Sequence, residues 1–127
     1  MESEILRGRR NFVVLGNTTD ESKYAYKIKE ALLKNGYGVV SIPADAESIN
    51  DVDMDIDLLD FCINPVKGLK LLSETKKSIA YAIIQPGAGS EDLERKLDEM
   101  GIPYVNGCVL RELEKDGRYT FDDSHNR

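Results

Sequence analysis

Ala82-Ile83-Ile84-Gln85-Pro86-Gly87-Ala88-Gly89-Ser90 is the stretch of this chain that decides its fold. Three apolar residues lead into a turn of small residues, and Ser90 is a good N-cap for the amphipathic segment that follows. This strand-to-helix turn is typical of open α/β sheets, whose ligands bind beyond the carboxyl ends of the strands. A second such run, Phe12-Val13-Val14-Leu15-Gly16-Asn17-Thr18-Thr19, lies near the amino end. Because helix N-termini attract anions, the two loops predict a site for a phosphate-bearing small molecule.

Short apolar runs alternate with amphipathic stretches along the chain, which predicts βαβ units and a mostly parallel sheet. The expected strands are residues 11–15, 38–42, 58–63, 78–84 and 104–105. The expected helices begin near residues 22, 66, 90 and 108, and they turn Tyr24, Ile28, Ala31, Leu32, Val66, Leu69, Leu72, Leu93, Leu97 and Met100 inward. The fold class is therefore a doubly wound α/β sheet of about five parallel strands with helices on both faces.

Length and composition restrict the classes of function. The 127 residues fit one domain, with an ordered core expected over about 11–116 and flexible ends at 1–10 and 117–127. A net charge of -6 argues against nucleic acid as a partner. The chain has no long apolar run and no signal-peptide pattern at its start, so we expect a cytoplasmic protein without a membrane contact. Cys62 and Cys108 lack metal-ligand spacing and the single histidine is His125, so no metal site is expected.

The acidic residues 43–57 predict a surface connection between strands, with an apolar contact at Ile49 or Val52. Upstream, the dinucleotide fingerprint G-x-G-x-x-G is absent, because Gly16 is followed by no second glycine. The second strand also ends at Ile42-Pro43, without an acidic residue at its tip to hold a ribose hydroxyl. Nicotinamide dinucleotide binding is disfavoured, although Asp45 lies close enough to keep that alternative open.

Several short motifs together resemble one known family, the small stand-alone CoA-binding proteins related to the CoA-binding domain of succinyl-CoA synthetase. They are Gly16-Asn17-Thr18, the segment Lys23-Tyr24-Ala25-Tyr26-Lys27-Ile28, Asn64-Pro65, Gln85-Pro86-Gly87-Ala88 and Gly107-Cys108-Val109. The resemblance covers about residues 11–113 and implies a Rossmann-like fold with CoA, or an acyl-CoA, across the carboxyl edge of the sheet. The chain departs from the family at Asn17-Thr18, where Ala-Ser is common, at Ile42-Pro43, where Asn-Pro is common, and at Tyr81, where tryptophan is usual.

The resemblance also implies roles for individual residues. Gly16, Asn17 and Thr18 would meet the pyrophosphate through backbone N–H groups and the Thr18 hydroxyl, and Lys23 would offer a charge to a phosphate. Pro43 would line the adenine side, Asn64 and Pro65 would form the opposite wall, and the loop Gln85, Pro86, Gly87 and Ala88 would leave room for the ligand. Cys108 would open a helix beside the crevice and form a mixed disulfide with the CoA thiol, whereas Cys62 belongs to the core.

Purely structural interpretations stand beside these roles. Thr18 and Glu21 match a capping box, and Tyr24 has the spacing of a packing residue. For Cys108, the burial habit of cysteine favours a small buried residue over a reactive thiol. No general base with a partner appears in the loops, so we expect binding without catalysis. The alternatives are an enzyme that uses NAD(P), and a ligandless interaction module that contacts a protein partner through residues 51–57. The sequence does not identify such a partner.

Overall fold

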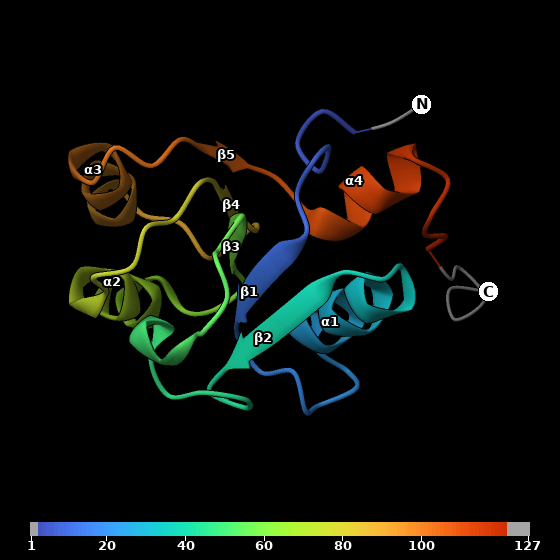
Figure 1. Ribbon diagram of the computed structural model, residues 1–127, viewed down its shortest axis with the longest axis horizontal. Helices are drawn as coiled ribbons and strands as arrows, with labels where there is room; N and C mark the ends of the chain where they lie inside the picture. Colours follow the sequence, from blue (N-terminus) through green and yellow to red (C-terminus); the bar gives the residue numbers. More distant parts are fainter. Residues whose placement is uncertain (1–2, 122–127) are drawn as a thin grey trace.

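The computed structural model describes residues 3–121 and contains one five-stranded parallel sheet between two layers of helices (Figure 1). The strands are β1 (Asn11–Leu15), β2 (Gly38–Ile42), β3 (Leu58–Phe61), β4 (Ala82–Ile84) and β5 (Tyr104–Asn106), in the order β2-β1-β3-β4-β5. The helices are α1 (Tyr24–Lys34), α2 (Pro65–Glu74), α3 (Glu91–Glu99), α4 (Val109–Lys115) and the short 3-10 helix η1 (Ile49–Asp51). The predicted α/β, Rossmann-like, doubly wound sheet is confirmed.

Two apolar layers hold the sheet between the helices. Side chains alternate along a strand, so Val13 and Leu15 pack toward α2 and α3, whereas Phe12 and Val14 pack toward α1 and α4. Figure 1 shows α2 and α3 on one side of the strands and α1 and α4 on the other. Burial on both faces explains why the strands are mostly apolar rather than alternately apolar and polar.

The helix ends follow local chemistry. Ser90 caps α3 by accepting a hydrogen bond from the Leu93 N–H at 3.1 Å, as predicted. The Asn64 side chain caps α2, and Pro65 occupies its first position, where a missing N–H costs nothing. The expected apolar contact under the acidic connection is present, because Ile49 and Val52 are buried.

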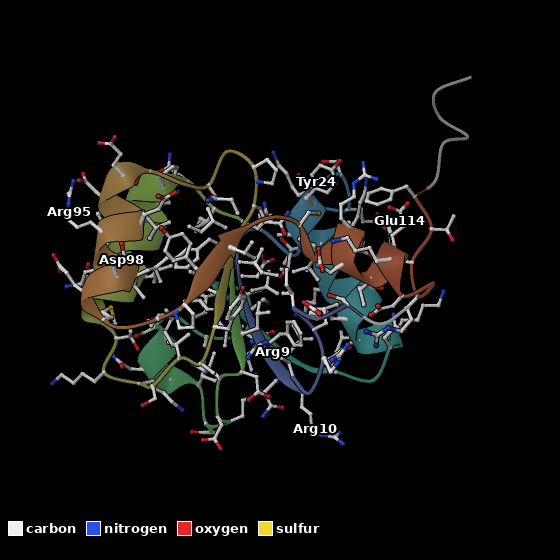
Figure 2. All side chains as sticks on the ribbon, turned by 90° about the horizontal axis from the view of Figure 1, so that it is seen from above. Arg9, Arg10, Tyr24, Arg95, Asp98 and Glu114 are labelled. Atoms are coloured by element: carbon white, nitrogen blue, oxygen red, sulfur yellow. The ribbon has the colours of Figure 1, made fainter. Side chains whose placement is uncertain are left out.

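Several expectations about individual residues were wrong. Tyr24 is 57% exposed and Val66 is 77% exposed, so neither packs inward (Tyr24 is labelled in Figure 2). α1 begins too late for Thr18 and Glu21 to form a capping box, and Lys23 is its N-cap without a side-chain hydrogen bond. β3 ends at Phe61 instead of residue 63, which leaves Cys62 half-buried just beyond the strand. β4 begins at Ala82 rather than at residue 78.

The chain ends also differ from the expectation of flexible segments. Leu6 is 2% exposed in the layer with α1 and α4, and the buried Ser3 hydroxyl donates a hydrogen bond to Glu112 at 2.6 Å. Tyr119 and Phe121 pack against the same layer. Residues 3–10 and 117–121 therefore belong to the packed domain, whereas residues 1–2 and 122–127, with His125, lie outside the described part. No helix within residues 3–121 is long and apolar enough to cross a membrane.

Candidate functional site

Two cavities open at the carboxyl edge of the sheet. The first has a volume of about 590 Å³ and is lined by Gly16, Asn17, Thr18, Thr19, Ile42, Pro43, Ala44, Glu47, Ile63, Lys67, Lys70, Leu71 and Glu74. The second has a volume of about 500 Å³ and is lined by Ile84, Gln85, Pro86, Gly87, Gly89, Ser90, Glu91, Glu94, Asn106 and Gly107. The first lies beyond the carboxyl ends of the parallel neighbours β1 and β3. The chain adds β2 on one side of this pair and β4 and β5 on the other, so this is the switch point at which open α/β sheets bind ligands.

Gly16 lets two backbone segments approach closely beneath the first cavity. Its φ is +152°, and a Cβ atom at this position would lie 2.4 Å from the carbonyl oxygen of Cys62. Its N–H donates to the Ile42 carbonyl at 3.0 Å. Gly16 therefore shapes the loop, and its own N–H is already used by the sheet rather than free for a phosphate.

The rest of this loop leaves two N–H groups open. The Asn17 side chain accepts hydrogen bonds from the Thr19 N–H at 3.0 Å and the Asp20 N–H at 3.1 Å, which curls the loop tightly. Among the residues that the structure describes, the N–H groups of Asn17 and Thr18 have no hydrogen-bond partner. Backbone N–H groups grouped in a loop in this way suit an anion.

Thr18 is tied to a polar network under the loop. Its hydroxyl, on a side chain only 6% exposed, donates to the Ser41 hydroxyl at 2.9 Å. Lys29 donates to Ser41 at 3.1 Å and pairs with Asp45 at 2.8 Å, and the Ser41 hydroxyl donates to Asp45 at 2.9 Å. Partial burial raises the pKa of Asp45, but the hydrogen bonds from Lys29 and Ser41 outweigh it and lower the pKa. The Thr18 proton is thus engaged within the protein, contrary to its expected role as a phosphate donor.

The cationic side of the first cavity comes from α2 rather than from Lys23. Lys23 is exposed at the start of α1 and does not line the cavity, whereas Lys67 and Lys70 do. Lys67, Lys70, Leu71 and Glu74 follow the spacing i, i+3, i+4, i+7 of a single helix face. That spacing was visible in the sequence, but nothing there indicated that the face borders a cavity.

Some of the other predicted site residues line a cavity, and the rest support the loops and helices around the cavities. Pro43 lines the first cavity, and Pro86 and Gly87 line the second. Asn64 and Pro65 form the start of α2 and line neither cavity, and Ala88 is buried beneath the β4 loop. The structure therefore separates the two loops that the sequence suggested would meet one ligand surface.

Gln85 and Cys108 join the second loop to α4. The Gln85 side chain, 5% exposed, accepts a hydrogen bond from the Val109 N–H at 2.9 Å and so satisfies one free donor at the start of α4. Cys108 is the N-cap of α4, is half-buried and lines neither cavity, although its neighbour Gly107 lines the second. No cluster of potential metal ligands occurs within residues 3–121.

Comparisons with known proteins agree with the observed fold. The family model of the CoA binding domain matches residues 10–114. A crystal structure of a protein redesigned for binding superimposes with a TM-score of 0.80 at 21% identity, covering 94% of this chain and 92% of that one. A conserved hypothetical protein from Pyrococcus furiosus gives 0.71 at 26% identity, over 81% of this chain and 98% of that one. A hypothetical protein from Pyrococcus horikoshii OT3 gives 0.79 at 22% identity, over 88% and 87%.

A search of curated proteins found no match. The family model nevertheless spans almost the whole of the sheet and both cavities. The chain belongs to the CoA-binding domain family.

Proposed function

We propose that this protein binds CoA or an acyl-CoA at the carboxyl edge of its sheet and does not itself catalyse a reaction. The observation that carries this proposal is the first cavity, whose lining residues lie within the segment that the family model matches. One wall is the loop after β1 with its open N–H groups, and the other is the face of α2 that carries Lys67 and Lys70. Such a pair of walls suits a pyrophosphate. Pro43 and Ala44 extend the same cavity with an apolar surface for the adenosine end.

Hydrogen bonding around the cavities supports binding without catalysis. Nucleophilic catalysis needs a hydroxyl or thiol bonded to a base. Among the lining residues, the Thr18 hydroxyl donates to Ser41, the Thr19 hydroxyl donates to Asn17, and the Ser90 hydroxyl accepts from a backbone N–H. The alternative of an NAD(P) enzyme is weakened because the carboxylate of Asp45, the residue that kept this alternative open in the sequence, is held by Lys29 and Ser41.

CoA should stabilise the folded protein. A ligand that binds only the folded state raises the free energy of unfolding by about 2.7 kcal/mol at 100 times its Kd. We expect CoA to raise Tm in scanning fluorimetry and to give saturable heat in calorimetry, and NAD to do so less. Replacing both lysines in Lys67→Gln/Lys70→Gln should weaken CoA binding about tenfold, since charge-assisted hydrogen bonds to phosphate are lost.

Lys23→Gln is the control, because it makes the same lysine-to-glutamine change at an exposed position outside the cavity. It should leave the Kd for CoA within about twofold, as expected for a screened surface charge. If Lys23→Gln raised the Kd for CoA more than Lys67→Gln/Lys70→Gln did, the phosphate would bind at the start of α1 instead. Lack of response to CoA, dephospho-CoA and acetyl-CoA at millimolar concentration in both assays would reject CoA binding.

The two cysteines should differ in their reaction with CoA disulfide. Burial, with the nearby Asp60 and Cys108, raises the pKa of the Cys62 thiol to about 12, so almost no Cys62 thiolate forms near neutral pH. In the reaction, a cysteine thiolate attacks one sulfur of CoA disulfide, forms a protein–CoA mixed disulfide and releases one CoA thiolate. Peptide mass spectrometry should locate a dithiothreitol-reversible adduct at Cys108.

Cys62→Ser should keep this adduct and Cys108→Ser should lose it. Preferential modification of Cys62 in the folded protein, or no modification of either thiol, would leave Cys108 as a packing residue. Non-covalent binding of CoA would be unaffected by that result.

A further inference from the structure

The second cavity differs from the first in charge. Its lining includes the carboxylates Glu91 and Glu94 and contains no lysine or arginine. In the first cavity, by contrast, two lysines balance the carboxylates of Glu47 and Glu74. The remaining walls are Ile84, Pro86, three glycines and the polar side chains of Gln85, Ser90 and Asn106. An anionic group that enters this space meets two negative charges without a balancing cation.

Glu94 is held in place at the cavity wall. Its carboxylate accepts a hydrogen bond from the Tyr104 hydroxyl at 3.3 Å, and the Asn106 amide lies 3.5 Å from its other oxygen. Both partners belong to β5, so they keep the charge at the end of that strand. Glu91 is the first residue of α3, one turn before Glu94, and presents a second carboxylate to the same space.

A ligand bound in the first cavity can extend toward the second. β1 and β4 are both neighbours of β3, so the loops after β1 and β4 are separated by two strand spacings, about 10 Å. Asn64 and Pro65 follow β3, the strand that lies between β1 and β4, and the next residue, Val66, is 77% exposed. An exposed valine offers an apolar surface for a flexible chain that leaves the phosphates.

We propose that the second cavity receives the acyl end of an acyl-CoA and that Glu91 and Glu94 select against acyl groups that end in a carboxylate. This inference rests on the proposed CoA function and adds the class of acyl group: uncharged acyl chains or the free thiol are accepted, and dicarboxylate-derived acyl groups are not. The edge of the sheet then carries a site with two lysines for the phosphates and a site whose charged residues are carboxylates for the thioester end.

Butyryl-CoA and succinyl-CoA test the selection, because both acyl chains have the same number of carbons and differ in one terminal carboxylate. Calorimetry at low salt should give a Kd for succinyl-CoA about fivefold higher than for butyryl-CoA, the size expected for like charges at close range in a solvated site. Glu91→Gln/Glu94→Gln should bring the ratio of the two Kd values close to one. Added salt should also narrow the ratio in the parent protein.

Asp98→Asn is the control, since it removes a carboxylate from an exposed position on the same helix that does not line the cavity (Asp98 is labelled in Figure 2). It should leave the ratio unchanged. The inference would be overturned if the parent bound both thioesters equally, or if the ratio of their Kd values were unchanged in Glu91→Gln/Glu94→Gln. In either case, binding of CoA itself would still support the proposed function. Failure to bind any of the three ligands would overturn both.

Discussion

Gly16→Ala is expected to destabilise the protein by about 4 kcal/mol or more, the range of exceptional single substitutions. The new Cβ would lie 2.4 Å from the Cys62 carbonyl oxygen and 2.9 Å from the Ala25 Cβ, and the backbone there has a positive φ. Relief requires moving β1 away from the segment after β3, or α1 away from the sheet. Urea denaturation followed by circular dichroism should show a large fall in the midpoint, or no folded protein at all.

Gly107→Ala is the matched control. Gly107 lines the second cavity, but a Cβ there meets nothing nearer than a Val105 methyl group at 3.9 Å, an ordinary contact. Its free energy of unfolding should change by less than about 1 kcal/mol. Equal stability of the Gly16→Ala and Gly107→Ala proteins would show that the close approach beneath the first cavity is not required.

Asp60→Val should stabilise the protein by about 1–3 kcal/mol at neutral pH. Asp60 lies in the middle of the sheet, is completely buried, and neither of its carboxyl oxygens has a hydrogen-bond partner within the described residues. Its register partners are Val14 on β1 and Ile83 on β4, both in the apolar layer with α1 and α4. An unpaired carboxyl group in such a place costs free energy, and a valine of similar size removes that cost.

The stabilisation by Asp60→Val should increase as the pH rises. Burial raises the pKa of Asp60 well above its ordinary value. In the unfolded chain the Asp60 carboxyl group titrates near pH 3.9. Below that pH the group is protonated in both states and the parent protein keeps its full stability. As the pH rises toward the folded pKa, the unfolded state loses its proton first and the free energy of unfolding of the parent falls. The difference in free energy of unfolding between Asp60→Val and the parent should therefore grow from pH 4 upward, by up to about 1.4 kcal/mol per pH unit.

Asp60→Asn separates charge from polarity. The amide does not titrate, so this variant should lose the pH dependence, yet it keeps an unpaired polar group and should be less stable than Asp60→Val. Denaturant titrations at several pH values measure all three proteins. A constant difference between Asp60→Val and the parent from pH 4 to pH 8 would mean that the carboxyl group finds a partner in solution.

The sequence was a good guide wherever local patterns coincide with burial. Residues 12–15 of β1 are all apolar because both faces of the strand are covered, and that pattern predicted the parallel sheet. The Ser90 cap and the inward Leu93 and Leu97 of α3 were predicted for the same reason, since capping and helical spacing act within one turn. These interactions are short-range in the chain.

Tyr24 and Val66 show where periodicity fails. Both have the spacing of core residues, but each lies in the first turn of its helix at the carboxyl edge, beyond the end of the sheet that would cover it. On α2 the close contact is made by Gly68, where a Cβ would lie 3.1 Å from the Phe61 ring. Which turn of a helix overlaps the sheet depends on packing between distant segments.

By itself, the sequence determined the fold class, most of the elements and the motifs of the CoA-binding family. Tertiary structure alone decided that Lys67 and Lys70, not Lys23, border the first cavity, that Thr18 is engaged by Ser41, and that the loops after β1 and β4 line separate cavities. The physical reason is that strand order and helix orientation bring together residues far apart in the chain. The residue type fixes the charge and hydrogen-bonding capacity of each side chain, but the packed structure determines which partner that side chain contacts.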